Sequence, residues 1–135
     1  SAVISLLYLV QKQNNNWIPL AALKYVAKLL DIPYTQVYEV STFYSMFNTK
    51  PVGRHDVAIC TNISCMLRGA EELVSYVEKK LDIKLGESTA DGKIFLKKEE
   101  ECLAACCGAP MMMVDHHYHE NLTKEKIDKI LGDLD

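Results

Sequence analysis

The sequence predicts a mixed α/β protein built from two parts, a helical segment over residues 1–50 and a compact α/β sandwich over residues 51–135. Residues 1–50 hold four lysines and two acidic residues, whereas residues 51–135 hold 11 basic and 16 acidic residues. Eight of the 11 aromatic residues lie in the first part, and all five cysteines lie in the second. The spacing of apolar residues also changes after Pro51, from a purely helical period to a mixture of helix and strand periods.

The first part is expected to form three short helices. Apolar residues recur at helical spacing over residues 3–10 and 20–30, and Pro33 begins a third helix that is expected to reach Phe47. The apolar side chains of that third helix cover more than half of its circumference, so we expect it to be packed on two sides. Fifty residues bury little surface, and the second side therefore faces either the cysteine-bearing part or another protein.

The second part is expected to mix strands with helices. The pattern predicts strands over residues 56–60, 93–97 and 111–114, with a further short strand left open after the last of these. One amphipathic helix is expected from Leu67 to Leu81, and Thr123 is expected to cap a final helix. This order of elements gives a compact α/β sandwich.

Length and composition exclude several classes of protein. At 135 residues and 15.2 kDa, the chain is too small for a large multi-site enzyme. A pI of 5.8 and only two arginines give no electrostatic footprint for nucleic acid. The longest apolar run, over residues 6–10, is far shorter than the roughly 20 residues that cross a bilayer. We therefore expect no nucleic-acid partner and no direct membrane insertion.

No enzymatic site of the chain's own is expected either. The six glycines form neither a dinucleotide-binding nor a P-loop pattern, so no nucleotide or flavin pocket is predicted. A thiol-disulfide oxidoreductase is disfavoured because the sequence contains no CxxC. The opening apolar segment also lacks the basic leader and cleavage pattern of a signal peptide.

The five cysteines are the strongest chemical signal in the sequence. They form Cys60-x4-Cys65 and, 36 residues later, Cys102-x3-Cys106, with Cys107 adjacent. An odd number without a secretory signal favours metal or thiol chemistry in a reducing compartment. Two pairs at strand ends can converge, and four thiolates bind either an iron-sulfur cluster or structural zinc. The loose spacing favours a 2Fe-2S cluster; Cys106 and Cys107 compete for one place, and the remaining thiol is expected to be a small buried hydrophobe.

Other residues near the cysteines in sequence are weaker candidates. A 2Fe-2S cluster on four thiolates is an anion, so it needs donors or cations nearby. Cys65 is expected just before a helix N-terminus, while Arg68 and His55 are candidate cations, each more simply explained as a surface residue. The histidine-rich run over residues 116–119 is expected on an exposed turn rather than in a second metal site.

Four sequence segments together resemble the small 2Fe-2S subunit of respiratory complex I, and the likeness covers essentially the whole chain. These segments are residues 38–47 (YEVSTFYSMF), residues 50–53 (KPVG), Cys60-x4-Cys65 and residues 101–110 (ECLAACCGAP). The resemblance implies a three-helix segment followed by a thioredoxin-like 2Fe-2S ferredoxin domain. It also implies that Cys60, Cys65, Cys102 and Cys106 are the iron ligands and that Cys107 is free.

The resemblance further implies a function and its partners. Such a chain is an electron-transfer subunit of NADH:quinone oxidoreductase, and its cluster exchanges one electron with FMN. FMN and NADH would be bound by the partner flavoprotein subunit, and a larger iron-sulfur subunit of the peripheral arm would be a second partner. The expected location is the cytoplasmic face of a bacterial inner membrane, or the matrix side in mitochondria. The charge-poor helices, with Tyr44 and Phe47, are then expected to contact a partner in part.

Two alternatives to this function stay open. Related subunits serve NAD-reducing hydrogenases and NAD-dependent formate dehydrogenases, and the resemblance does not separate these assemblies. A zinc-stabilised thioredoxin-like interaction module is a more distant possibility.

The sequence also raises questions of backbone conformation at two loop positions, Ala104 and Pro110. Ala104 stands where the resembled family usually has glycine, which matters only if the position needs a positive φ. Pro110 is expected to be the cis-proline typical of thioredoxin-like folds.

Overall fold

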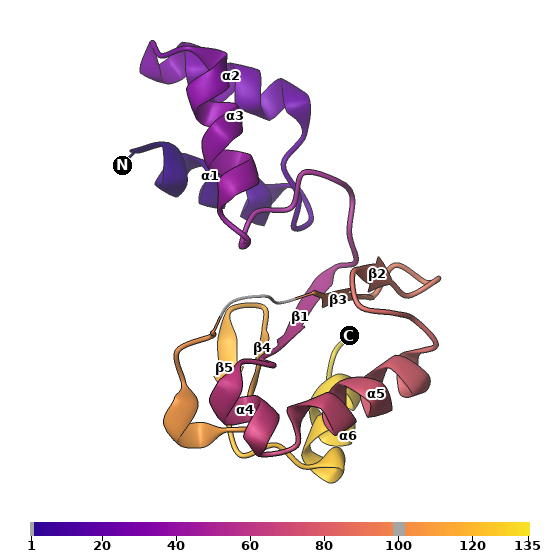
Figure 1. The fold of residues 1–135 in the computed structure, drawn as a ribbon. Coiled ribbons are helices and arrows are strands. Elements are labelled where there is room, and N and C mark those ends of the chain that lie inside the picture. Colours follow the sequence, from indigo (N-terminus) through magenta and orange to yellow (C-terminus); the bar gives the residue numbers. More distant parts are fainter. Residues whose placement is uncertain (1, 99–101) are drawn as a thin grey trace. The chain divides into compact units, whose positions relative to one another are not determined.

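The computed structural model describes residues 2–98 and 102–135 of the chain, which divides into two compact units, Ser1–Val52 and Gly53–Asp135. Figure 1 shows helices in the first unit and a sheet with helices in the second. Glu101, part of the sequence motif around Cys102, lies outside the described residues. Within the described ranges, no helix is both long enough and apolar enough to cross a membrane.

The first unit is a bundle of the three predicted helices, α1 (Ala2–Gln13), α2 (Leu20–Leu30) and α3 (Tyr34–Phe43). The chain leaves α2 through Asp31 in a left-handed conformation and enters α3 directly after Pro33. Each helix turns one apolar stripe inward, and the buried core consists of Leu7, Ile18, Leu23, Val26, Ala27, Val37 and Phe47.

The third helix is shorter than predicted because the chain that follows it is bound back to α1. The amide of Gln11, which is 3% exposed, donates from Nε2 to the Met46 carbonyl at 2.9 Å. Its Oε1 accepts the Asn48 N–H at 2.7 Å. These bonds draw the segment across the bundle and bury Phe47, so the helix ends at Phe43 and Tyr44 is extended. The expectation that Phe47 contacts a partner is therefore wrong, since its side chain belongs to the core of the bundle.

The second unit is built on a five-stranded sheet with β1 at its centre, in the order β2-β3-β1-β4-β5. β1 is parallel to β3, and every other neighbouring pair is antiparallel. The strands are β1 (His55–Ile59), β2 (Glu87–Ser88), β3 (Ile94–Lys97), β4 (Met112–Val114) and β5 (His117–His119). The predicted α/β class is confirmed, and β5 is the short strand that the sequence left open.

Two helices cover one face of this sheet, α5 (Ala70–Leu81) and α6 (Lys124–Gly132). Val57 and its neighbours in β3 and β4, Leu96 and Val114, share that face and pack against apolar residues of both helices. The predicted cap of the last helix is confirmed, because the Thr123 side chain accepts the Lys126 N–H at 3.2 Å.

A polar network also joins the two covering helices. The Tyr76 hydroxyl donates to Asp128 at 2.7 Å, and the Lys80 ammonium lies 2.9 Å from the same carboxylate. Hydrogen bonds from Lys80 and Tyr76 lower the pKa of Asp128. The network fixes α5 against α6 on the sheet.

The helix predicted from Leu67 is broken into two helices in the structure. A short helix, α4 (Ile63–Leu67), precedes α5, and the chain turns between them at Gly69 with φ of 87°. A left-handed turn is readily adopted by glycine, which allows α5 to begin in a new direction. Leu67 is 77% exposed, so it is not the first apolar residue of the amphipathic helix. Cys65 consequently lies inside α4 rather than before a helix.

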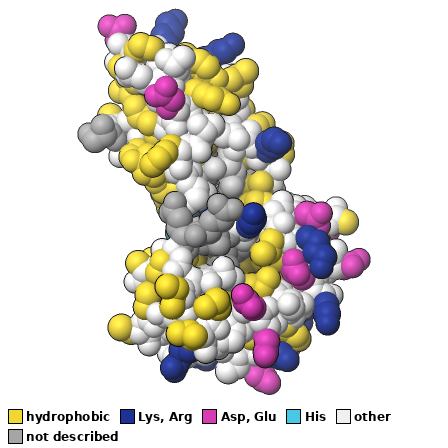
Figure 2. Space-filling model, in the orientation of Figure 1, with side chains coloured by type: hydrophobic (Ala, Val, Ile, Leu, Met, Phe, Trp, Pro, Cys, Tyr) yellow, Lys and Arg dark blue, Asp and Glu magenta, His cyan; other side chains and the backbone are white. Residues whose placement is uncertain are grey.

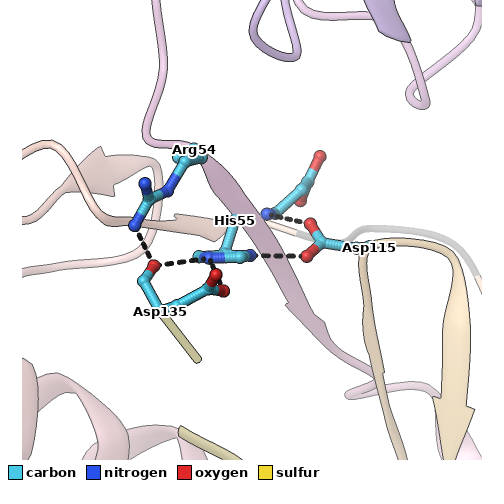
Figure 3. A network of polar contacts seen from close by, with 5 residues as sticks. Arg54, His55, Asp115 and Asp135 are labelled. Carbon is cyan, nitrogen blue, oxygen red and sulfur yellow. Dashed lines mark hydrogen bonds and ion pairs between the residues drawn. The ribbon is translucent and has the colours of Figure 1, made fainter. Parts of the chain in front are cut away.

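A second correction concerns the histidines. The turn before β5 is formed by Asp115 and His116, both with positive φ, and the other two histidines of the run lie in β5 rather than on a turn. His55 begins β1 and contacts the Asp115 carboxylate at 2.6 Å through Nδ1 (Figure 3). Its Nε2 lies 3.0 Å from the Asp135 main-chain oxygen, which Arg54 also contacts. His55 therefore fastens the start of β1 and is not a cation of the cysteine site, which lies at the other end of that strand.

Candidate iron-sulfur site

The four cysteines expected as ligands line one small cavity in the second unit. β1 and β3 are parallel, so both strands end at the same edge of the sheet, and the two cysteine segments follow these ends. The cavity has a volume of about 50 Å³. Its lining residues are Cys60, Asn62, Ile63, Ser64, Cys65, Cys102 and Cys106. The structure thus brings together two cysteine pairs that are 36 residues apart in the sequence.

The first pair is part of the protein core. Cys60 is 2% exposed and directly follows β1, and its N–H donates to the Met111 carbonyl at 3.1 Å. Cys65 is 1% exposed and sits in α4, whose first turn is capped by the Asn62 side chain. Both thiols belong to an apolar cluster that also contains Ala70, Ala109 and Met111. Regular secondary structure and packing therefore fix the positions of this pair.

The second pair lies on the surface of a loop. Cys102 and Cys106 are both exposed, and their sulfurs are 3.5 Å apart. Two thiolates on one tetrahedral metal ion, with metal–sulfur bonds of about 2.3 Å, lie roughly 3.8 Å apart. The observed separation is close to that value. The loop enters a short 3-10 helix, η1 (Cys106–Gly108), which starts at the second of these cysteines.

The surroundings of Cys65, Cys102 and Cys106 shift the pKa values of these thiols. Burial raises the pKa of Cys65. The Ala104 N–H, which donates to the Cys102 sulfur at 3.3 Å, lowers the pKa of Cys102, and the Cys106 thiol adds to this effect. The hydrogen bond and the charge shared with Cys102 raise the pKa of Cys106. Without a metal, Cys102 is thus the favoured thiolate of the exposed pair, and metal uptake would release protons from Cys65 and Cys106.

The donor set, four thiols around one cavity, fits a 2Fe-2S cluster. Four thiols face one cavity, and no carboxylate or imidazole is among its lining residues. In residues 2–98 and 102–135, no three His, Cys, Asp or Glu side chains come close enough to hold one ion. Structural zinc needs all four ligands around one centre, whereas two irons each need only a pair of protein sulfurs.

Two residues near the site lie elsewhere than expected. Cys107 is exposed and does not line the cavity, so the expectation of a small buried hydrophobe is wrong. Its place in η1 explains this, because successive side chains of a 3-10 helix project about 120° apart.

Arg68 ends α4 rather than beginning a helix, and its Nε donates to the Ala109 carbonyl at 2.9 Å. This hydrogen bond links α4, which contains Cys65, to the segment that follows Cys106.

Both loop expectations matter in the structure. Ala104 has φ of 61°, so this position does require the left-handed conformation. The Ala109–Pro110 peptide bond is cis, as expected. The hydrogen bond from Arg68 to the Ala109 carbonyl could not be expected from the sequence, because no local pattern pairs these two residues.

An apolar rim, defined as Ile63, Met66 and Leu67, lies on α4, the helix that carries Cys65. Ile63, Met66 and Leu67 of α4 are 68%, 44% and 77% exposed, respectively. Figure 2 shows that hydrophobic side chains also reach the surface of the helical unit. Large apolar side chains grouped beside a cofactor site are typical of a surface that another protein covers.

The family is shown by comparison with known proteins. A family model for thioredoxin-like 2Fe-2S ferredoxins matches residues 1–135, and the chain belongs to this family. Among its relatives is an NADH-quinone oxidoreductase subunit of Rickettsia felis, 47% identical over 133 residues that span 98% of this chain and 79% of the relative. The corresponding protein of Rickettsia conorii is 46% identical over 134 residues, 99% of this chain and 80% of the relative.

A solved structure supports the fold independently. The crystal structure of an NAD+-reducing NiFe-hydrogenase in the air-oxidized state contains a chain that matches this fold with a TM-score of 0.77. The match covers 94% of this chain and 22% of the hydrogenase chain, at 19% sequence identity. At that identity the likeness shows a shared fold, including the helices that precede the sheet.

Proposed function

We propose that this chain is the 2Fe-2S electron-transfer subunit of an NADH:quinone oxidoreductase, with Cys60, Cys65, Cys102 and Cys106 as the iron ligands. The observation that carries the proposal is the convergence of these four thiols on one cavity. It is supported by the identity of 46–47% along nearly the whole chain to proteins that are named as subunits of NADH-quinone oxidoreductase.

The chain's own residues would hold and tune the cluster. When bound, a 2Fe-2S cluster supplies storage for one electron. Cys60 and Cys65, buried in the apolar cluster, would keep water away from one side of the site. Cys102 and Cys106 would leave the other side near the surface, where electrons enter and leave. The Ala104 N–H, already aimed at a sulfur, would offset part of the negative charge.

The apolar rim suggests where the electron donor docks. A flavoprotein subunit that binds FMN and NADH would cover Ile63, which lines the cavity, together with the exposed Met66 and Leu67 of the same helix. The helical unit would contact a partner subunit through exposed aromatic residues, and the larger iron-sulfur subunit is proposed as the second partner of the chain. Phe43 is 77% exposed and, with Tyr44, lines a shallow groove on α3. Such contacts would put the chain in a peripheral arm on the cytoplasmic side of a bacterial membrane or the matrix side of a mitochondrial one.

A subunit of an NAD-reducing hydrogenase or of an NAD-dependent formate dehydrogenase is the second candidate. The hydrogenase structure favours it only at the level of the fold, because the identity is 19%. The much higher identity to subunits of NADH-quinone oxidoreductase favours complex I. A zinc-stabilised module is disfavoured, because the family model that matches residues 1–135 is that of thioredoxin-like 2Fe-2S ferredoxins.

The test is reduction by NADH through the flavoprotein partner. The full chain is loaded with its cluster and mixed with NADH, with and without the FMN-containing subunit that co-purifies with it. We expect the electron paramagnetic resonance signal of a reduced 2Fe-2S cluster only when the flavoprotein is present. Leu67→Asp should abolish this signal while dithionite still produces it. A cluster that NADH fails to reduce in the intact complex would contradict the proposal.

A further inference from the structure

We propose that Ala104 is a positioning residue whose left-handed backbone holds its N–H against the Cys102 sulfur and thereby sets the reduction potential of the cluster. The inference rests on the proposed function, because it takes Cys102 as an iron ligand. It concerns a residue that is neither a ligand nor part of the cavity lining.

The backbone conformation of Ala104 is exceptional in this chain. Eight described residues other than glycine have positive φ, and seven of them are Asn, Asp or His. These three residue types adopt the left-handed region more readily, because their polar side chains bond locally. Ala104 has no such side chain and still has φ of 61°. Something outside the residue must therefore hold it there.

Its two neighbours supply that constraint. Leu103 and Ala105 are half-buried and both pack against the apolar cluster that contains Cys60 and Cys65. The Ala105 carbonyl also accepts the Gly108 N–H at 3.0 Å, which starts the turn of η1. With both neighbours anchored inward, the chain must turn outward between them, and Ala104 is exposed.

The same turn directs an N–H toward a ligand sulfur. The Ala104 nitrogen lies 3.3 Å from the Cys102 sulfur. Hydrogen bonds to ligand sulfurs stabilise the reduced, more negative cluster and raise its potential. The exposed methyl group of Ala104 contributes nothing to this bond. The proposed effect therefore belongs to the backbone, and a substitution acts only through its preference for the left-handed conformation.

The test compares Ala104→Gly, Ala104→Asn and Ala104→Val in the full chain. Glycine and asparagine accept the conformation more easily, so the potential should remain unchanged, and the Ala104→Gly apoprotein should unfold on the order of 3 °C higher. Valine disfavours the conformation, so the N–H should leave the sulfur. The potential of the Val variant should then become more negative, and a chelator should remove its cluster several-fold faster. If the apoprotein of the Ala104→Val variant folds but assembles no cluster, the loss of the hydrogen bond has destabilised the cluster completely.

Ala105→Gly is the matched control. Ala105 has φ of −118°, so glycine there relieves no left-handed strain and removes a packed methyl group. This variant should lower the unfolding temperature of the apoprotein, the opposite of the change expected for Ala104→Gly. A lower unfolding temperature for Ala104→Gly, or an unchanged potential for Ala104→Val, would overturn the inference.

Failure of the proposed function would look different. A wild-type chain that takes up no 2Fe-2S cluster refutes that function and the effect on potential together. The unfolding temperature of the apoprotein is expected to rise in Ala104→Gly and to fall in Ala105→Gly. These opposite changes test the strained turn without any cluster.

Discussion

The two cysteine pairs of the site differ in how the fold holds them. Cys60 and Cys65 are 2% and 1% exposed and lie on a strand end and a helix, where they form part of an apolar core. Cys102 and Cys106 are exposed on a loop that passes through a strained residue into a short 3-10 helix. Regular secondary structure and core packing therefore hold the first cysteine pair, whereas the second pair lies on a loop that packs against this core.

This difference separates two roles that a ligand cysteine can have. A buried thiol contributes to packing even before any metal is bound, because it behaves as a small hydrophobe. An exposed thiol contributes little to packing, so its main contribution is to metal binding. Substitutions in the two pairs should therefore have the same effect on the cluster but different effects on the apoprotein.

The largest effect is expected for Cys65→Ser. The change removes a ligand and also places a hydroxyl in the apolar cluster around Ala70 and Met111. Burying a polar group that lacks a good partner costs about 1–3 kcal/mol. We expect loss of the cluster together with a lower free energy of unfolding of the apoprotein, measured by urea denaturation. An apoprotein as stable as the wild type would show that this thiol is not part of the core.

Cys102→Ser should abolish the cluster and leave the apoprotein nearly as stable as before. The side chain is exposed, so its replacement should change the free energy of unfolding by less than about 0.5 kcal/mol. Iron content and urea denaturation measure the two effects separately. Equal destabilisation by Cys102→Ser and Cys65→Ser would remove the distinction between the pairs.

Arg68→Ala tests the link between the pairs and should have the smallest effect. The change deletes the hydrogen bond that ties α4 to Ala109, worth about 0.5–1.5 kcal/mol. We expect a chain that still assembles its cluster but loses it faster to a chelator. Arg54→Ala is the matched control, since Arg54 lies at the opposite end of β1. An equal loss rate in the two variants would show that the Arg68 contact does not hold the site together.

Much of this architecture could be predicted from local patterns. Apolar periodicity located α1 and α2, and Thr123 marked the start of α6, because capping and helical spacing are local properties. The meeting of two cysteine segments at one sheet edge could be anticipated, since each follows a strand. Cys106, rather than Cys107, lines the cavity with the other three cysteines.

The errors arise where distant contacts decide local structure. The end of α3 depends on Gln11, more than thirty residues away in sequence, which binds the chain at Met46 and Asn48. The break before α5 has a local cause instead, the positive φ of Gly69, which the spacing of apolar residues does not reveal. The position of His55 likewise depends on Asp115, 60 residues further along.

The most direct test of the proposed cluster is the iron and acid-labile sulfide content of the full chain and of two neighbouring variants. We expect wild type and Cys107→Ser to contain equal amounts of iron and sulfide and to give the resonance signal of a reduced 2Fe-2S cluster. Cys106→Ser should lose both. Retention of the cluster in Cys106→Ser with loss in Cys107→Ser, or zinc without sulfide in the wild type, would contradict the assignment of the four ligands.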